Sequence, residues 1–280
     1  MKCVEFANAK INLYLDVSEK RPDGFHTVTT VMHQITLHDE LNIEAEDSDK
    51  TQVNLEVIGG GADIPTDEKN LVVIAIKSFL ERIGRTMKIH VMLFKNIPSM
   101  AGLGGGSSDA AAALRGMNSM LNSPLTTDRL EELSSTIGSD VPFFISNIKA
   151  LCLGRGEILL PFKPSLKAYV VLAEGSETSS TKAAFSRLDE MPRSENVHPD
   201  FSNFTFENVY NVFEDIIKID CPSVEKNLAV LKDFCPEAAA MSGSGSTVYG
   251  LFKDEMQAKM AEYVLRKRGV KTHFCELVQE

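Results

Sequence analysis

Apolar and polar residues alternate along much of the first third of the chain, and a period of two is typical of strands with one buried face. The alternation is found in residues 3–17, 28–37, 53–58 and 88–94. In the last of these segments Ile89, Val91 and Leu93 share one side. We therefore expect several strands early in the chain, with a tight turn over Arg21–Gly24 between the first two.

Helical patterns become common after residue 70. The sequence predicts helices over 70–83, from 110 onward, over 127–137, through 183–188 after a cap at Ser179 or Ser180, and over 204–217, 224–234 and 255–268. It predicts further strands over 150–153, 167–173 and 271–277, and a loop of small residues over 238–249 that leads into a strand. Because several strands come first and helices are added without a regular strand–helix rhythm, the pattern favours the α+β class over a doubly wound sheet.

A glycine-rich stretch, Pro98–Ser108, connects the strand over 88–94 to the alanine-rich helix. Glycines let backbone N–H groups approach a ligand, and the first helical turn adds unpaired donors and a positive dipole end, which together suit a phosphate. The stretch has no lysine after its glycines, as a Walker A loop would, and Ser107 stands where a dinucleotide fingerprint needs glycine. The alternative is a simple turn capped by Ser107 or Ser108, with Asp109 complementing the first helical turn.

Three other places combine polar side chains with apolar neighbours. Lys10 lies among small and apolar residues, as an active-site charge or an edge-strand lysine would. Phe25 and His26 follow a turn, which suits either strand packing or contacts with a flat heterocycle. Asp140 precedes a proline and two phenylalanines, so it is either a helix N-cap or a fixed carboxylate that could act as a general base.

Composition limits the compartment and the partners. With 280 residues the chain is long enough for two domains, and its formal net charge of −10 argues against nucleic acid or an anionic membrane as the main partner. No apolar run approaches the ~18 residues of a membrane span, and no signal-peptide pattern opens the chain, so we expect a cytoplasmic protein. The five cysteines are scattered without a Cys-x-x-Cys pair, which predicts reduced thiols and no structural metal.

The stretch Pro98–Ser108 closely resembles the phosphate loop of the GHMP kinases, the family of galactokinase and of homoserine, mevalonate and phosphomevalonate kinases. The resemblance covers nearly the whole chain, through Ala9–Leu13, Arg21–His26, Gly138–Phe144, Gly154–Glu157 and Met241–Thr247. It implies an α+β, two-domain GHMP kinase fold. Residues 1–161 would form an N-terminal domain with ribosomal-protein-S5-like β/α architecture, and residues 162–280 a C-terminal α/β sandwich domain.

The resemblance also implies a role for each matching residue. Lys10 and Asp140 match the catalytic pair, Asp140 as the base and Lys10 as the charge that keeps it ionised. ATP binding is implied for the loop residues Pro98, Ser99, Met100, Ala101, Gly102, Leu103, Gly104, Gly105, Gly106, Ser107 and Ser108. Substrate binding is implied for Asn12, Phe25, His26 and Phe185, with His26 reading the edge of a cytosine base.

The implied reaction is the ATP-dependent phosphorylation of the 2-hydroxyl of 4-diphosphocytidyl-2-C-methyl-D-erythritol, a small molecule with a cytidine diphosphate moiety, in the non-mevalonate route to isoprenoid precursors. Mg²⁺ should accompany ATP, although the sequence declares no metal ligand beyond a weak candidate in Ser107. Phe25 stands where tyrosine is usual, which keeps stacking and removes a hydroxyl, and Asn211–Glu214 departs from a common Asn-Asp-Leu-Glu, so we assign no binding role there.

Two alternatives remain open. One is a kinase of the same family that acts on a smaller alcohol such as mevalonate or homoserine. The other is a non-catalytic nucleotide-binding protein on the same fold, although such a protein would have no need of Lys10 and Asp140. The sequence leaves the oligomeric state, monomer or homodimer, undecided.

Overall fold

The structure is a computed structural model that describes residues 1–21, 24–60, 64–177, 180–190 and 197–279. The chain divides into two compact units, the first made of residues 1–9, 38–99 and 104–148 and the second of the remainder. Neither unit is one continuous stretch of sequence, because the chain passes between them inside two long strands. The division into domains at residues 161 and 162 therefore stays a prediction.

The secondary structure mixes strands and helices in both units. The strands are β1 (Lys2–Lys20), β2 (His26–Asp47), β3 (Gln52–Gly59), β4 (Met87–Lys95), β5 (Lys149–Leu153), β6 (Ile158–Pro161), β7 (Tyr169–Ala173), β8 (Tyr210–Asn211), β9 (Ala238–Met241), β10 (Val248–Phe252) and β11 (Thr272–Glu276). The helices are α1 (Leu71–Arg82), α2 (Gly105–Met120), α3 (Thr127–Ser135), α4 (Phe143–Ser146), α5 (Thr181–Glu190), α6 (Glu214–Asp220), α7 (Pro222–Asp233) and α8 (Glu255–Lys267). The predicted α+β class is confirmed.

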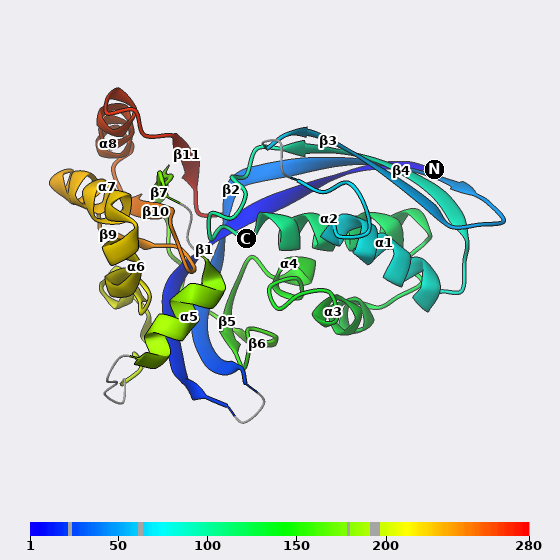
Figure 1. The fold of residues 1–280 in the computed structure, drawn as a ribbon, viewed down its shortest axis with the longest axis horizontal. Coiled ribbons are helices and arrows are strands. Elements are labelled where there is room, and N and C mark those ends of the chain that lie inside the picture. The colour runs from blue at the N-terminus through cyan, green and yellow to red at the C-terminus, as the bar shows by residue number, and fades with distance from the viewer. Residues whose placement is uncertain (22–23, 61–63, 178–179, 191–196, 280) are drawn as a thin grey trace. The chain divides into compact units, whose positions relative to one another are not determined.

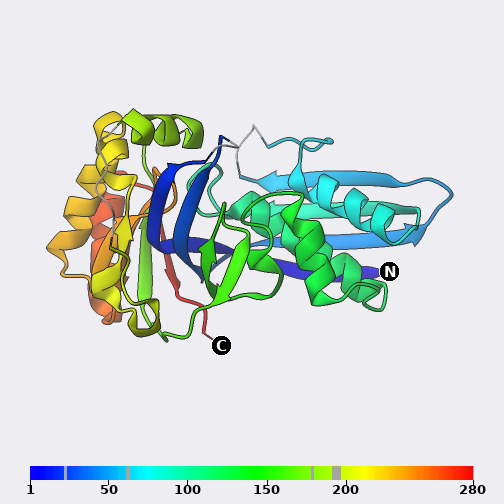
Figure 2. The ribbon, with the colours of Figure 1, turned by 90° about the horizontal axis from the view of Figure 1, so that it is seen from below.

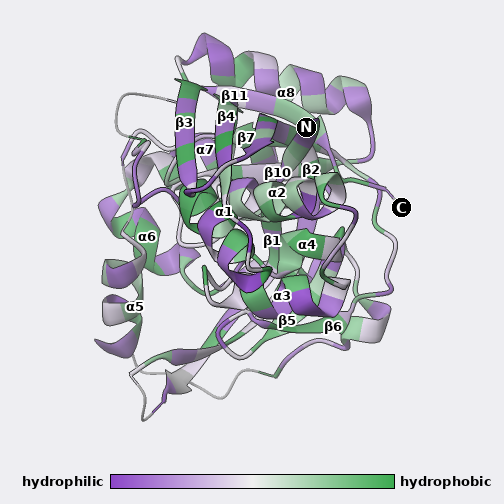
Figure 3. Ribbon diagram, turned by 90° about the vertical axis from the view of Figure 1, so that its right-hand side faces the viewer, coloured by the Kyte–Doolittle hydropathy of each residue, from purple (hydrophilic) through white to green (hydrophobic). Residues whose placement is uncertain are grey.

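The first unit is a sheet covered on one face by helices. Its strands follow the order β3-β4-β2-β1, with β4 antiparallel to β2 and parallel to β3. Helices α1 to α4 lie along one face of this sheet in both views (Figures 1 and 2). The alternation read from the sequence explains this layering, because Ile89, Val91 and Leu93 of β4 are buried while the residues between them are not. Figure 3 colours the ribbon by hydropathy, and hydrophobic and hydrophilic positions alternate along the neighbouring strand β3.

Helix α2 is the buried centre of the first unit. Its residues 110–114 are fully buried, and their small side chains let the helix approach its neighbours closely. The side-chain amide of Asn118 fixes the far end of the helix, since it donates to Leu125 O at 3.0 Å and accepts from Leu125 N at 3.0 Å. The start of α2 is therefore presented by a helix that is anchored along its length.

The second unit contains a four-stranded antiparallel sheet in the order β11-β7-β10-β9. Helices α7 and α8 pack against this sheet, and α5 and α6 add to the same apolar core. The core also takes in Leu15 and Val17 of β1. Tyr249 of β10 is completely buried, and its hydroxyl donates to Asn12 O at 2.7 Å; burial raises the pKa of this tyrosine above its usual value.

Two segments differ from their predicted structure. The helix predicted over 204–217 is interrupted by the short strand β8, because Tyr210 and Asn211 pair in parallel with Tyr14 and Leu15 of β1. Residues 238–241, predicted as loop, form β9 and pair with β10. In both places pairing with a distant strand overrides local preference.

Two sequence predictions fall partly on residues that the structure does not describe. Pro22 and Asp23 of the predicted turn and Ser179, one of the two predicted helix caps, lie outside the described residues. The other predicted cap is confirmed, since Ser180 Oγ accepts from Ala183 N at 3.4 Å. Within the described part of the chain, no helix has both the length and the apolar character needed to cross a bilayer.

Asn211 offers a test of the second unit. Its buried amide donates to Met241 O at 2.6 Å and Gly243 O at 2.8 Å, and accepts from Phe213 N at 2.9 Å. Because Asn211→Ala leaves these backbone groups buried and unpaired, we expect the free energy of unfolding in urea to fall by about 2–3 kcal/mol.

Asn54→Ala is the control, since Asn54 only contacts His90 at an exposed position. It should change the free energy of unfolding by less than about 0.5 kcal/mol. Equal losses for the two variants would contradict the role given to Asn211.

Candidate functional site

The glycine-rich loop leads directly into α2. Met100, Gly102 and Gly104 have positive φ angles of 54°, 76° and 72°. The N-cap residue of α2 is Gly104, which has no side chain to accept from the first helical N–H groups. The alternative of a cap at Ser107 or Ser108 is therefore wrong, and Asp109 lies beyond the first turn. The start of α2 presents backbone donors of the kind that suit an anion.

The middle of the loop, residues 100–103, belongs to the second unit and packs there against the turn after β9. Ser242 Oγ donates to Gly102 O at 2.9 Å, and a Cβ on Gly102 would lie 2.2 Å from Ser242 O. The neighbouring Leu103 O accepts from Lys10 N at 2.9 Å. The structure thus brings together three segments that are distant in sequence: β1, the loop and the turn at 242–243.

Lys10 is buried, with 4% of its surface exposed. Its Nζ donates to Asn12 Oδ1 at 2.7 Å, and Asn12 Nδ2 donates to Thr30 Oγ1 at 2.8 Å. The interpretation of Lys10 as a surface lysine on an edge strand is therefore wrong. Burying an ammonium group costs free energy unless the group is paired and hydrogen-bonded. The burial of Lys10 therefore favours its interpretation as an active-site charge.

His26 lies between an aromatic ring and a carboxylate. Its ring centroid is 4.9 Å from that of Phe185, with 31° between the planes, and its Nε2 is 2.6 Å from Asp189 Oδ1. The hydrogen bond from His26, helped by the charge of Lys20, holds the pKa of Asp189 below its usual value. Asp189 was not predicted, although its place one helical turn after Phe185 on α5 could have indicated it.

Phe25 lies apart from that pair. Its ring is 52% exposed and is covered by the guanidinium of Arg155, whose Cζ is 5.1 Å from the ring centroid. Arg155 belongs to the turn after β5, and Gly154 O in that turn accepts from Val28 N at 2.6 Å. Within the second unit, the ring of His26 thus contacts that of Phe185, and the ring of Phe25 contacts the guanidinium of Arg155.

Asp140 lies in the turn before α4, in the first unit. The N-cap residue of α4 is Pro142 and no side chain caps this helix, so the N-cap interpretation of Asp140 is wrong. Arg115 of α2 holds α4 in place, because its Nη1 donates to Phe144 O at 2.6 Å. Asp140 thus lies in the turn that leads into a short helix fixed to α2, whereas Lys10 belongs to the other unit.

A buried ion cluster adjoins the start of α2 and was missed by sequence reasoning. Lys95 Nζ contacts Asp39 Oδ2 and lies 2.7 Å from Asp109 Oδ2. Burial, together with the charge of Asp39, raises the pKa of Asp109 above its usual value, and the charge of Lys95 opposes that rise. Burial alone would lower the pKa of Lys95, but the two carboxylates outweigh it and raise the pKa. The sequence signal that could have indicated this cluster is Lys95 itself, a charged residue at the end of a strand in which every second residue is apolar.

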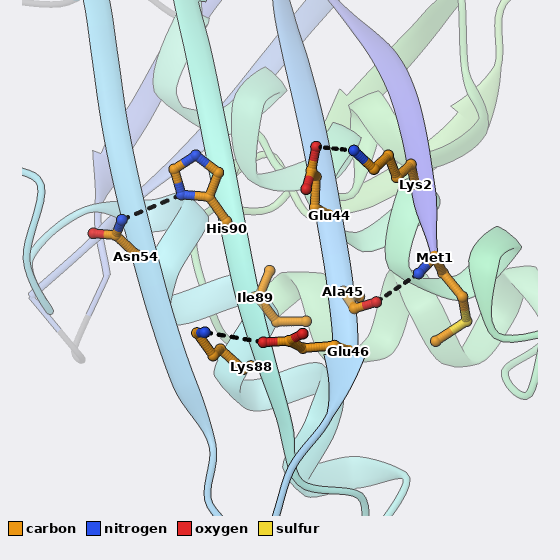
Figure 4. A pocket seen from close by; sticks show the side chains of 9 residues that line it. All are labelled: Met1, Lys2, Glu44, Ala45, Glu46, Asn54, Lys88, Ile89 and His90. Carbon is orange, nitrogen blue, oxygen red and sulfur yellow. Dashed lines mark hydrogen bonds and ion pairs between the residues drawn. The ribbon is translucent and has the colours of Figure 1, made fainter.

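A hollow on the outer face of the first unit's sheet is lined by residues that include Lys2, Glu44 and His90 (Figure 4). Its polar side chains already contact one another: Lys2 pairs with Glu44, Lys88 with Glu46, and His90 is within hydrogen-bond distance of Asn54. It contains none of the predicted site residues. We therefore place the candidate site at the glycine-rich loop and not in this hollow.

No metal centre accompanies the loop among the residues that the structure describes. Within those ranges no three His, Cys, Asp or Glu side chains are grouped so that they could hold an ion. Two oxygens near the start of α2, Ser108 Oγ and Asp109 Oδ1, are buried and have no hydrogen-bond partner in the described protein.

Both the sequence and the fold of this chain are similar to those of known proteins. The family model described as GHMP kinases N terminal domain matches residues 70–147, and that described as GHMP kinases C terminal matches residues 199–271. A protein of Geobacillus sp. (strain WCH70) named 4-diphosphocytidyl-2-C-methyl-D-erythritol kinase is 38% identical over 99% of this chain and 96% of its own length. A protein of Desulfotalea psychrophila with the same name is 35% identical, over 93% of this chain and 89% of its own length.

Two solved structures have folds similar to that of this chain. A crystal structure of 4-(cytidine 5'-diphospho)-2C-methyl-D-erythritol kinase superposes with a TM-score of 0.84 at 27% identity, covering 99% of this chain and all of the other. The homoserine kinase of Cytophaga hutchinsonii superposes with a TM-score of 0.72 at 17% identity, over 99% of this chain and 94% of its own, which speaks for the fold alone.

Gly102 and Gly106 form a matched pair for testing the loop. Gly102→Ala combines a left-handed φ with a Cβ only 2.2 Å from Ser242 O, so we expect the free energy of unfolding to fall by about 2–4 kcal/mol. Gly106 is helical, and its Cβ would meet only Leu71 Cδ1 at 3.8 Å. Gly106→Ala should therefore raise the free energy of unfolding by about 0.5–1 kcal/mol.

Chemical denaturation of both variants measures the difference. If Gly102→Ala proved as stable as Gly106→Ala, the packing of the loop against Ser242 would be refuted.

Proposed function

The chain belongs to the GHMP kinase family, and from that premise we propose that it transfers the γ-phosphoryl group of ATP to the 2-hydroxyl of 4-diphosphocytidyl-2-C-methyl-D-erythritol. The observation that carries this choice of substrate is the 38% identity over 99% of the chain with a protein named for that reaction. The reaction belongs to the non-mevalonate route to isoprenoid precursors. A cytoplasmic location is part of the proposal.

The glycine-rich loop binds the ATP phosphates in this proposal. Phosphoryl transfer depends on positioning and on stabilising charge more than on covalent chemistry. The loop residues 98–108 supply backbone N–H donors, and the first turn of α2 adds the positive end of the helix dipole. Packing of Gly102 against Ser242 and the bond from Lys10 N to Leu103 O support a preformed loop.

Mg²⁺ would accompany ATP, and the hydroxyl oxygens of Ser107 and Ser108 at the start of α2 would hold it. The ion prefers oxygen ligands and is commonly held by one or two protein groups together with phosphates and water. Ser108 Oγ is buried without a hydrogen-bond partner among the described residues, and Ser107 adjoins it. When bound, the ion neutralises charge on the phosphates during transfer.

Asp140 and Lys10 act on the acceptor hydroxyl. Asp140 accepts the proton of the hydroxyl as it attacks, a step that contributes about 10²–10⁴ in rate. Lys10 keeps the carboxylate ionised and stabilises the developing negative charge. The burial of Lys10 and its hydrogen bond to Asn12 support this role, because an ammonium held in one position needs no reorganisation during the reaction.

His26 and Phe185 bind the cytosine ring, with Asn12 and Phe25 on the substrate side. A carboxylate only accepts hydrogen bonds, so the contact with Asp189 places a hydrogen on His26 Nε2. In the neutral ring Nδ1 is then an acceptor, which suits the exocyclic amine of cytosine and finds no donor on the corresponding oxygen of uracil. Phe185 offers an apolar face for stacking.

The rival activities lack a use for these groups. A kinase for mevalonate or homoserine has no base to read, and a non-catalytic binder needs neither Lys10 nor Asp140. ATP consumption measured with the cytidyl substrate, mevalonate and homoserine in parallel tests the proposal. Turnover with the cytidyl substrate alone is expected; turnover confined to a smaller alcohol, or with none of the three, would refute it.

Removing the base should separate binding from chemistry. Asp140→Asn should lower kcat at least about 100-fold while the dissociation constant of ATP stays within a few-fold, because the amide keeps the shape and loses the proton acceptor. Asp128→Asn, at an exposed position in the first turn of α3, is the control and should keep kcat within twofold. Near-normal kcat in Asp140→Asn would remove Asp140 as the base.

Removing the imidazole of His26 should weaken the binding of only one of the two substrates. His26→Ala should raise KM for the cytidyl substrate by about tenfold or more and leave KM for ATP nearly unchanged, since a lost buried hydrogen bond and ring contact weaken binding by about 1–3 kcal/mol. His90→Ala, on the outer face of β4, should change neither constant. Equal increases in the two constants of His26→Ala would count against base recognition.

A further inference from the structure

Three buried charges meet at the two ends of the glycine-rich loop. Asp39 comes from β2, Lys95 is the last residue of β4, and Asp109 lies on α2. Their side chains are 0%, 5% and 5% exposed. All three belong to the first unit, and none is among the residues assigned to ATP, substrate or catalysis above.

Asp39 fixes the start of the loop. Its Oδ1 accepts from Asn96 N at 2.6 Å and from Ile97 N at 2.8 Å, the two residues between β4 and Pro98. Asn96 Nδ2 adds a bond to His38 O at 3.0 Å. The backbone that enters the loop is therefore tied to β2 by a carboxylate that solvent does not reach.

Lys95 fixes the end of the loop. Its Nζ bridges the carboxylates of Asp39 and Asp109, which joins the strand before the loop to the helix after it. The contact is close, because a Cβ on Gly105 would lie 3.2 Å from Lys95 Nζ and 3.0 Å from Ile97 Cγ2. The absence of a side chain on Gly105 lets the two ends of the loop touch.

The same contacts exclude a direct role for Lys95 in binding phosphate. Its charge is already balanced by two buried carboxylates, and its side chain is nearly inaccessible. Lys95 thus leaves the phosphates to other groups of the loop, chief among them backbone N–H donors, whose directions depend on the separation and orientation of the loop ends. Donors held in place before binding add affinity, because little ordering is left to be done when the ligand arrives.

We propose that Asp39, Lys95 and Asp109 form a clamp that sets the span of the glycine-rich loop, and that they are positioning residues for the nucleotide phosphates. The inference rests on the proposed function only in taking the loop as the ATP site. It predicts that damage to the clamp weakens nucleotide binding out of proportion to its effect on the cytidyl substrate.

Asp109→Ala and Asp109→Asn test the clamp. Asp109→Ala removes the acceptor for Lys95 Nζ, whereas the amide oxygen of Asp109→Asn can still accept from it. Asn118→Ala is the matched control, because it removes two buried hydrogen bonds at the far end of the same helix. For each variant the dissociation constant of ADP is measured by calorimetry in EDTA, so that metal binding does not contribute, together with both KM values and urea stability.

Asp109→Ala should weaken ADP binding about tenfold and raise KM for ATP similarly, with KM for the cytidyl substrate within about threefold. Asp109→Asn should recover most of the affinity, and Asn118→Ala should lose stability while binding ADP within twofold of the wild type. If Asp109→Ala does not fold, Asp39→Asn replaces it. The new amide keeps an acceptor for Asn96 N and Ile97 N but turns a donor toward Lys95 Nζ. The same selective loss of ADP affinity is expected.

Normal ADP affinity in the clamp variants would overturn the clamp, as would equal weakening of ADP and of the cytidyl substrate. A wild-type chain that binds ADP but phosphorylates no cytidyl substrate would refute the proposed function and leave the clamp to be decided by ADP binding. A wild-type chain that binds no ADP would overturn both.

Discussion

A buried ammonium between two buried carboxylates is the constraint on which the glycine-rich loop depends. Charges are taken out of water at great cost, and the cluster of Asp39, Lys95 and Asp109 is tolerable only because each group faces an opposite charge. Removing Lys95 would leave both carboxylates buried without a partner, and removing either carboxylate would leave Lys95 with one, so the arrangement has few alternatives. A loop of glycines has many conformations of its own, and this cluster together with the contact between Ile97 and Gly105 restricts where it can begin and end.

The second unit constrains the middle of the same loop by different means. There the contacts are neutral: Ser242 Oγ donates to Gly102 O, and Lys10 N donates to Leu103 O. The hydrogen bonds from Lys10 to Asn12 and from Asn12 to Thr30 pair three buried polar side chains with one another. The loop is therefore specified by ion pairs at its ends and by hydrogen bonds at its centre.

In the proposed function the two substrates are met by different kinds of group. Backbone donors of the loop would face the phosphates, which are the same in every nucleoside triphosphate and need no side-chain recognition. The side chains of His26 and Phe185 would face the base, with the hydrogen bond to Asp189 fixing the tautomer of His26. This division would explain why the glycine-rich loop identifies only the family, whereas the residues at 25–26 and 185 distinguish one member from another.

The sequence by itself determined most of the local structure and the family to which the chain belongs. Alternation gave β4, the alanine run gave α2, and the motifs around Lys10, His26, the loop and Asp140 pointed to a kinase, because periodicity and motif spacing are properties of short segments. What joins segments distant in the chain was decided only by the tertiary structure. Asp39 and Asp109 lie in unrelated local patterns and become one feature only when β2 and α2 flank Lys95. Likewise β8 interrupts the helix predicted over 204–217 because it pairs with β1, nearly two hundred residues away, and local sequence carries no record of that partner.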